Sequence, residues 1–288
     1  MVHSQSKKVS VIIPNYNYAR YIKKRIASIL KQTYPIYELI VLDDDSTDNS
    51  NAIIESVLAK AKVDYPKVKI TYIRNENNSG KAILQWKKGL ELAKGDYVWI
   101  AEADDLSKKT FLEEAMKGFD DKDVVLSYTE SMIINGKGLI LAPNFRFSRD
   151  KEKTGHFKKS YIKLGEDEIK EIMAIRCTIP NVSAVVFKND KRLLGYLDEA
   201  VKYKQVGDWY LYLKILENGK IAYNRKSCNK FRIHGDSVTR KSRENRSHFD
   251  EIRQLHKVLK KQYQLDEKTI GFMDEEEMRV SIEHGIMK

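Results

Sequence analysis

The sequence is poor in cysteine and has no hydrophobic stretch long enough to cross a membrane. It has 288 residues and only two cysteines, Cys177 and Cys228. Two cysteines are too few for a disulfide framework, and these two lack the spacing of a metal site. No segment approaches the roughly 18 apolar residues of a membrane span, and the N-terminus has only a short apolar stretch. We therefore expect neither a signal peptide nor a transmembrane helix. A cytoplasmic location is the expected one.

Two glycine-rich phosphate-binding motifs are also missing. No G-x-G-x-x-G segment opens the first predicted helix, and no G-x-x-x-x-G-K-[ST] segment occurs anywhere in the chain. The dinucleotide-binding and P-loop interpretations therefore lose their main support. The segment "NNSGK" (77–81) could bring backbone amides and Lys81 to a diphosphate, but it is equally typical of a plain turn.

Positive charge is in excess and unevenly spread. The net charge is +11, and residues 220–261 contain thirteen Lys or Arg against four Asp or Glu, whereas the tail from Gln262 onward is net acidic. Such a basic stretch could serve nucleic acid, an anionic membrane face or a phosphate-bearing substrate, or could be a solvated helix face. The 42% hydrophobic content is sufficient for a sizeable globular core.

The first half of the chain alternates between strand-like and helical patterns. Short runs rich in β-branched and aromatic residues predict strands at 9–13, 38–42, 68–73, 97–101 and 123–128. Between the first four, apolar residues recur with helical spacing. This alternation predicts an α/β, Rossmann-like, mostly parallel central sheet with helices on both faces. Ligands of such sheets bind at the carboxyl ends of the strands.

The regular alternation is lost after Thr129. We expect an irregular or inserted region over 130–180 with a helix at 167–175, a strand at 182–187, a helix at 207–219, short strands at 220–223 and 229–234, and an amphipathic helix at 243–261. Ile252, Leu255 and Leu259 form one face of that last helix. The fold is thus completed by a C-terminal helical segment.

Three carboxylates end the fourth predicted strand without a basic residue among them. Glu102, Asp104 and Asp105 follow the apolar run "YVWIA". Burying unpaired carboxylates together is costly, so they lie in solvent or surround a positive charge. Several such oxygens could hold a hard cation such as Mg2+ or Mn2+. The alternative is a solvated loop.

More carboxylates follow the second predicted strand. Asp43, Asp44 and Asp45 belong to "LDDDSTDNS", and their oxygens could accept hydrogen bonds from a nucleotide base or ribose. The same segment also contains residues suited to cap the next helix, and the two roles are compatible. Acidic side chains therefore gather at one edge of the predicted sheet.

Taken in order, four segments resemble one known family. They are "VSVIIPNYNYARYIKKRIASILKQTY", "ELIVLDDDSTDNS", "NENNSGKAILQWKKGLELAKGDYVWIAEADD" and "GDWYLYLKILENGKIAYNRKSCNKFRIHGDSVT". Together they resemble the family 2 glycosyltransferases of the GT-A fold, over roughly residues 8–240. The resemblance implies a nucleotide-sugar-binding half at 8–129 and an acceptor-binding half at 130–240, followed by a basic helix and acidic tail at 241–288. It also implies inverting sugar transfer from a nucleotide diphosphate donor.

The resemblance implies roles for the residues that match the family's motifs. We expect nucleotide contacts from Pro14, Asn15, Tyr16, Asn17, Asp43, Asp44, Asn78, Gly80, Lys81, Glu102 and Ala103. The D-x-D element and the later R-x-H element assign a divalent cation, Mn2+ or Mg2+, to Asp104, Asp105 and His234. The match is imperfect, because Glu102 replaces the usual first Asp and Asp45 stands where the family commonly has Gly.

The resemblance also suggests a catalytic base. Asp208 in "VGDWYLYL" occupies the second position of the family's acidic pair, with Gly207 in place of the first acid. A helix N-terminus favours its ionised form, although Asp208 could simply cap that helix. Phosphate or acceptor contacts are expected from Arg232, Asn181 and Trp209.

The resemblance implies a metal-dependent glycosyltransferase that uses a UDP-sugar or dTDP-sugar and a saccharide or lipid-linked acceptor. Surface polysaccharide or glycolipid synthesis is the expected context, with the basic stretch holding the enzyme at the inner face of the cell membrane. A sugar-phosphate nucleotidyltransferase is the enzymatic alternative. A nucleic-acid-binding protein is the non-enzymatic one, but the acidic sheet edge would repel a phosphate backbone, so no nucleic acid is expected.

Overall fold

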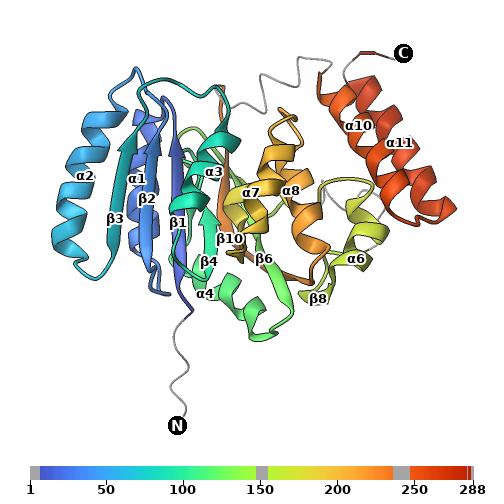
Figure 1. The fold of residues 1–288 in the computed structure, drawn as a ribbon, viewed down its shortest axis with the longest axis horizontal. Helices are drawn as coiled ribbons and strands as arrows, with labels where there is room; N and C mark the ends of the chain where they lie inside the picture. Colours follow the sequence, from blue (N-terminus) through green and yellow to red (C-terminus); the bar gives the residue numbers. More distant parts are fainter. Residues whose placement is uncertain (1–6, 147–154, 236–246, 284, 287–288) are drawn as a thin grey trace, which may run out of the picture.

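The protein is built around one central sheet with helices on both faces (Figure 1). The computed structural model describes residues 7–146, 155–235, 247–283 and 285–286. In Figure 1, α2 and β3 lie at one end of the molecule, and the last two helices lie at the other. The α/β architecture expected from the sequence is confirmed.

The first half is a parallel sheet whose strands alternate with helices. Its elements are β1 (Val9–Asn15), α1 (Ala19–Leu30), β2 (Glu38–Asp43), α2 (Ser50–Asp64), β3 (Lys69–Arg74), α3 (Ala82–Leu92) and β4 (Tyr97–Ile100). The strands lie in the order β3, β2, β1, β4 and pair in parallel. Every residue of β1 is buried, as expected for a central strand covered on both faces.

The second half extends the sheet through one reversed strand. β9 (Val185–Lys188) lies between β4 and β6 (Val124–Asn135) and runs antiparallel to both. β10 (Lys220–Ile233) pairs in parallel with β6. Consequently β6 and β10 point the same way as β1 to β4, and all of these strands end at the same edge of the sheet. This common edge, the upper one in Figure 1, is called the C-terminal edge below.

Two sequence expectations for this half need correction. The two short strands predicted at 220–223 and 229–234 are one strand, β10, because register shifts between Asn224 and Asn229 let it stay paired with β6. The strand predicted at 182–187 begins with a 3-10 turn, η3 (Val182–Ala184).

The described parts of the region 130–180 contain more regular structure than expected. β6 continues to Asn135, and the region adds a hairpin strand, an edge strand and a helix that passes into a π-helical turn. The remaining elements are β5 (Leu106–Ser107), α4 (Phe111–Met116), η1 (Lys117–Asp120), β7 (Ile140–Ala142), β8 (Tyr161–Leu164), α6 (Gly165–Glu168), η2 (Ile169–Met173), α7 (Arg192–Ala200) and α8 (Gly207–Leu216).

Two helices end the chain and pack into the main core. α10 (Ser247–Gln262) buries its apolar face, and the acidic tail forms α11 (Glu267–Glu283). Lys260 of α10 pairs with Asp274 of α11 at 2.6 Å, so the acidic helix neutralises part of the basic one. None of the described helices is long and apolar enough to cross a membrane.

Candidate active site

The topology brings the predicted site residues to the C-terminal edge. The ends of β1, β2, β4 and β10 lie there, together with the start of β9, which runs the opposite way. Short turns join α3 to β4 and α8 to β10, so these helices run opposite to the parallel strands and begin at this edge. Segments far apart in the sequence thereby meet at one place.

The ends of β1 and β2 are locked together by Asp43. This carboxylate is fully buried and accepts hydrogen bonds from Asn15 Nδ2 (2.7 Å), Ser46 Oγ (2.8 Å) and the Ser46 backbone N–H (2.8 Å). Pro14 is buried in β1. These side chains shape the edge of the sheet, and a bound nucleotide would meet mainly the loops that they hold.

The loop after β1 is exposed and has a left-handed residue. Asn17 has φ 58°, and its side-chain oxygen accepts hydrogen bonds from the backbone N–H groups of Thr47 (2.8 Å) and Asp48 (3.2 Å). The neighbouring Tyr16 is 44% exposed. Asp45 also has a positive φ, 59°. Glycine adopts this conformation without strain, which explains why it suits this position of the family motif.

Asp44 organises the loop before α3. It is buried and accepts hydrogen bonds from Asn75 Nδ2 (2.6 Å), Ser79 Oγ (2.7 Å) and Gln85 Nε2 (2.8 Å). Asn78 donates to the backbone oxygen of Asp44 at 2.8 Å. Asp44 therefore fixes the backbone that leads to the two other predicted nucleotide contacts.

Those two contacts differ in availability. Gly80 has φ 75°, which glycine adopts without strain, and its N–H donates to Asn78 Oδ1 at 2.8 Å. Lys81 donates from Nζ to the Val201 carbonyl at 2.6 Å. Lys81 thus anchors the end of α7, and it would have to leave this carbonyl in order to reach a diphosphate.

The acidic segment after β4 splits into three environments. Glu102 accepts a hydrogen bond from Trp86 Nε1 at 2.8 Å, and Ala103 is fully buried. Asp105 is buried and accepts hydrogen bonds from the Asn181 side-chain amide and, at 2.8 Å, from the Arg232 backbone N–H. These contacts fix the loop, with Asp104 between its two acidic neighbours.

Asp104 is paired with His234. The Asp104 Oδ2 to His234 Nε2 distance is 3.0 Å, and the two side chains are 15% and 5% exposed. Among the described residues, only His234 contacts the Asp104 carboxylate as a hydrogen-bond donor. The two residues lie 130 positions apart in the sequence and meet because β4 and β10 end at the same edge of the sheet.

Arg232 links this loop to the β6–β7 turn. Its Nε donates to the Asp104 carbonyl, and its Nη1 donates to the carbonyls of Asn135 (2.9 Å) and Gly136 (3.3 Å). The guanidinium also lies over the Tyr21 ring at 4.6 Å. Arg232 therefore brings positive charge beside the acidic segment while it holds two loops in place.

Nearby positive charges do not fully balance the carboxylates of the acidic segment (Glu102, Asp104 and Asp105). Burial is the larger cause and the charge of Asp104 the second, and together they raise the pKa of Glu102 to about 8 and the pKa of Asp105 to about 7. Carboxylates that hold their protons near neutral pH would ionise fully if a cation joined them. The donor set, a carboxylate beside an imidazole, suits Mn2+ and, less well, Mg2+.

These residues fit a cation that is only partly held by protein. Within the described ranges, no group of three or more His, Cys, Asp or Glu side chains is arranged to hold a metal alone. Mn2+ and Mg2+ commonly bind through one or two protein groups together with substrate phosphates. The Asp104–His234 pair matches that second arrangement.

Asp208 lies in the first turn of α8, at the same edge. It is partly exposed, and burial of its carboxyl raises the pKa of Asp208 to about 6. Besides burial, Asp208, Cys177 and Glu102, in that order of effect, raise the pKa of the fully buried Tyr212, so Asp208 and Glu102 both lie near this tyrosine. An acid with a pKa near 6 in such a place is suited to act as a general base.

Not every predicted residue lies at this edge in an available form. Trp209 is buried in the core, and its Nε1 donates to the Met173 carbonyl at 2.9 Å. Asn181 is also buried, and its amide is occupied by Asp105 and Asn229. As placed, Asn181 positions Asp105, and neither side chain is free for an acceptor.

Ser183 belongs to the site and was not predicted from the sequence. Its Oγ accepts a hydrogen bond from the Glu102 N–H at 3.0 Å, and its carbonyl accepts one from Trp99 Nε1 at 2.9 Å. Ser183 therefore couples the acidic segment to the sheet beneath. Small polar residues at a strand entry are common, so only the three-dimensional pairing reveals this role.

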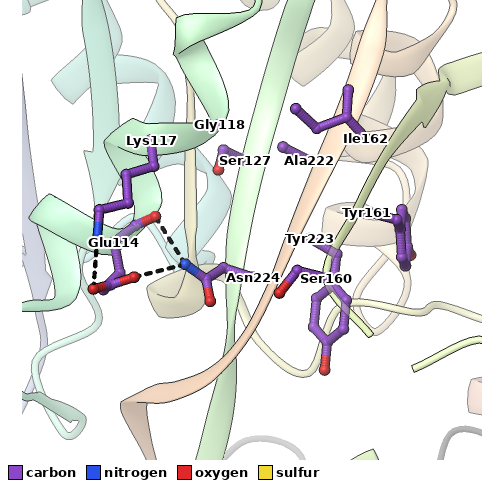
Figure 2. A pocket seen from close by; sticks show the side chains of 10 residues that line it. All are labelled: Glu114, Lys117, Gly118, Ser127, Ser160, Tyr161, Ile162, Ala222, Tyr223 and Asn224. Carbon is purple, nitrogen blue, oxygen red and sulfur yellow. Dashed lines mark hydrogen bonds and ion pairs between the residues drawn. The ribbon is translucent and has the colours of Figure 1, made fainter. Parts of the chain in front are cut away.

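A cavity of about 290 Å³ lies elsewhere, between α4 and the earlier parts of β6 and β10 (Figure 2). Its charged groups satisfy one another: Glu114 accepts hydrogen bonds from Lys117 Nζ (2.8 Å) and Asn224 Nδ2 (2.9 Å). Burial would raise the pKa of Glu114, but hydrogen bonds from Lys117, Lys226 and Asn224 lower it to about 2. The cavity contains none of the predicted site residues.

Comparison with known sequences gives one family. Residues 10–178, more than half of the chain, match glycosyl transferase family 2. The putative teichuronic acid biosynthesis glycosyltransferase TuaG of Bacillus subtilis is 36% identical over 121 residues, which are 42% of this chain and 45% of TuaG. The similarity to glycosyltransferase GlyG of Streptococcus pneumoniae covers 37% of that protein, so the matched part is less than half of these relatives.

A longer alignment joins the chain to an Escherichia coli enzyme. UDP-Glc:alpha-D-GlcNAc-diphosphoundecaprenol beta-1,3-glucosyltransferase WfgD is 27% identical over 236 residues, which are 80% of this chain and 79% of WfgD.

Solved structures are similar over nearly the whole chain. S. aureus TarS 1–349 in complex with UDP-GlcNAc has a TM-score of 0.66 at 21% identity and covers 96% of this chain and 72% of its own. Mannosyltransferase PcManGT from Pyrobaculum calidifontis, in complex with GDP-Man and Mn2+, has a TM-score of 0.58 at 17% identity, with coverages of 99% and 77%. These similarities identify the fold as GT-A.

Proposed function

The chain belongs to glycosyl transferase family 2, and from this premise we propose that it transfers a sugar from a nucleoside diphosphate donor to an acceptor hydroxyl, with inversion at the anomeric carbon. The observation that carries the proposal is the Asp104–His234 pair, 3.0 Å apart at the C-terminal edge beside Arg232. Asp208 at the start of α8 supplies a carboxylate at the same edge.

UDP is the proposed nucleotide. WfgD is named for a UDP-Glc donor, and TarS has been solved with UDP-GlcNAc. PcManGT has been solved with GDP-Man, so GDP is an alternative nucleotide to be tested directly, together with dTDP. In this chain the loops held by Asp43 and Asp44 would receive the base and ribose, with Tyr16 exposed beside them.

The residues of the proposed site would have separate roles in the transfer. Asp104 and His234 would hold Mn2+ or Mg2+, which when bound supplies a Lewis acid for the charge on the leaving diphosphate. Arg232 stabilises the same region with a fixed positive charge. Asp208 removes the proton from the acceptor hydroxyl as that oxygen attacks the anomeric carbon from the opposite face. Inversion then needs no covalent sugar–enzyme intermediate.

The released product separates this function from the enzymatic alternative. A glycosyltransferase releases the nucleoside diphosphate, whereas a sugar-phosphate nucleotidyltransferase releases pyrophosphate. We expect UDP and no pyrophosphate when the protein is incubated with UDP-sugars, Mn2+ and candidate acceptors. Pyrophosphate formation would reject the proposal. Salt-sensitive binding of nucleic acid without UDP release would favour the basic-protein alternative.

The pKa of Asp208 predicts the acidic limb of the pH profile. Because the base must be ionised and its pKa is raised to about 6, kcat/KM should fall about tenfold per pH unit below about pH 6 and level off above it. The measurement is kcat/KM against pH at constant ionic strength. Persistence of this same limb in the residual activity of Asp208→Asn would assign it to another group.

The acceptor is proposed to be lipid-linked. WfgD is named for an acceptor on diphosphoundecaprenol, and the chain carries an exposed apolar feature near the site. Leu139, Ile140 and Leu141 are 63%, 59% and 60% exposed. Leu139 lies in the turn between β6 and β7 and the other two in β7, and the hairpin formed by these strands is here called the apolar hairpin. Arg232 connects its turn to the Asp104 loop.

Charge around the apolar hairpin fits an anionic bilayer. Residues 131–146 and 229–235 together contain four Lys or Arg and no Asp or Glu. The apolar face of α10, by contrast, is buried in the protein. Within the basic stretch 220–261, Arg253 and Lys257 lie on α10, whereas Arg243 and Arg246 lie outside the described residues. The apolar hairpin is therefore the better-supported contact.

Replacing leucines of the apolar hairpin by aspartate should weaken membrane binding. We expect the double variant Leu139→Asp/Leu141→Asp to bind vesicles of phosphatidylcholine and phosphatidylglycerol at least about tenfold less tightly, because each leucine loses its apolar burial and the new charges are repelled. Val63→Asp is the matched control, since Val63 is 78% exposed on α2. Unchanged vesicle binding in the double variant, with loss in Arg253→Glu/Lys257→Glu, would move the contact to α10.

A further inference from the structure

Arg25 is a buried charge to which the proposed mechanism assigns no role. It lies on α1, is 0% exposed, and its Nε, Nη1 and Nη2 atoms have no hydrogen-bond partner among the described residues. Burying a guanidinium without hydrogen bonds or an ion pair is unfavourable. Such a group is unexpected in a position that only packs a helix onto a sheet.

The surroundings of Arg25 connect it to the acidic segment. Its guanidinium lies over the Trp99 ring at 5.1 Å, which offsets part of the desolvation. Trp99 donates to the Ser183 carbonyl, and Ser183 Oγ accepts a hydrogen bond from the Glu102 N–H. One rigid chain of contacts therefore fixes the position of the guanidinium relative to the loop that carries the carboxylates.

The electrostatic coupling of Arg25 points to the same loop. Burial lowers the pKa of Arg25 to about 10, while Asp105, Asp104 and Glu102, in that order of effect, favour its charged form. Arg232 is the opposing cation. At neutral pH Arg25 is thus positively charged. Because the guanidinium is buried, solvent screens it little, and its charge acts on the carboxylates without direct contact.

We propose that Arg25 is a built-in counter-charge that makes divalent-cation binding at Asp104 and His234 depend on a diphosphate. Arg25 offsets negative charge on Asp104 and, once they ionise, on Glu102 and Asp105, so a lone cation gains little and is repelled by the guanidinium. A diphosphate brings negative charge of its own and restores the attraction. The inference rests on the proposed function, and in it Arg25 acts as a positioning residue through its charge.

Three variants test this role. Arg25→Met removes the charge with similar apolar volume, Arg25→Lys keeps the charge, and Lys24→Met is the matched control. Lys24 is the exposed neighbour of Arg25 on the same helix. Replacing a buried unpaired charge by a packed apolar side chain is usually neutral or stabilising, so Arg25→Met should melt no lower than the wild-type protein.

The measurement is calorimetric titration of Mn2+, first alone and then in the presence of saturating UDP. We expect Arg25→Met to bind Mn2+ alone about tenfold or more tightly than wild type, and the gain from UDP to shrink by a similar factor. Arg25→Lys and Lys24→Met should resemble wild type.

Equal Mn2+ affinities in folded Arg25→Met and wild type, or weaker binding in the variant, would overturn the inference. If Arg25→Met does not fold, the neutral Arg25→Gln is judged by the same criterion. A wild-type protein that binds no Mn2+ even with UDP would instead reject the proposed function, so the two failures are distinguishable.

Discussion

Replacing Asp208 by asparagine should lower kcat for sugar transfer by about 10^2- to 10^4-fold, the range that a general base contributes. Asp208 lies in the first turn of α8, where asparagine is also compatible with a helix start. The variant should therefore keep its folding stability and its affinity for UDP. A selective loss of kcat would assign proton removal to this carboxylate.

The matched control is Asp198→Asn. Asp198 is an exposed acid on α7 that pairs with Lys87, so its replacement should leave kcat within about twofold. If Asp208→Asn also keeps its kcat but loses stability, Asp208 is only a helix cap. A parallel loss of UDP affinity would mean that the substitution disturbs the donor site as well.

The second large effect is expected from Asp104→Asn. The variant should lose Mn2+-dependent UDP binding by at least about 100-fold, because even outer-shell changes at metal sites cost 10- to 100-fold. The introduced amide could still contact His234, so the loop should remain folded. Asp198→Asn is again the control, because it removes one negative charge from the exposed surface of α7. Equal losses in the two variants would indicate a general charge effect.

Much of the fold from β1 to β4 was predictable because the sequence patterns that encode it are local. Short β-branched runs predicted β1 to β4, and the apolar stripes between them predicted the helices. The parallel order then implied that Asp43, Asp44 and the acidic segment share one edge of the sheet. The β10 strand was predicted as two pieces because its irregular centre, near Ser227, gives no continuous alternation.

The details of the site depend on partners far apart in the sequence. Asn181 meets Asp105 across 76 residues, and His234 meets Asp104 across 130 residues. No local pattern encodes such a pair. The resemblance to family motifs supplied Asp104 and His234 as candidates, but it also suggested Trp209, which packs in the core.

The position of Arg25 is unusual already at the level of the sequence. It follows Ile22 by three residues and precedes Ile29 by four, so helical spacing puts it on the buried stripe of α1. A charged residue on an apolar stripe requires either a partner or a function. The sequence carries that anomaly, whereas the proximity of Trp99 and the acidic segment appears only in the structure.

The metal dependence of donor binding is tested most directly by titration of UDP into the wild-type protein by calorimetry, with Mn2+ and then with EDTA. We expect binding with Mn2+ and a loss of affinity of at least about tenfold with EDTA, because in the proposed mechanism the acidic segment holds a cation against the diphosphate. UDP binding of equal strength in both conditions would contradict a metal-dependent site. Absence of binding in both conditions would contradict the UDP donor, and repetition with dTDP and GDP would show whether another nucleotide takes its place.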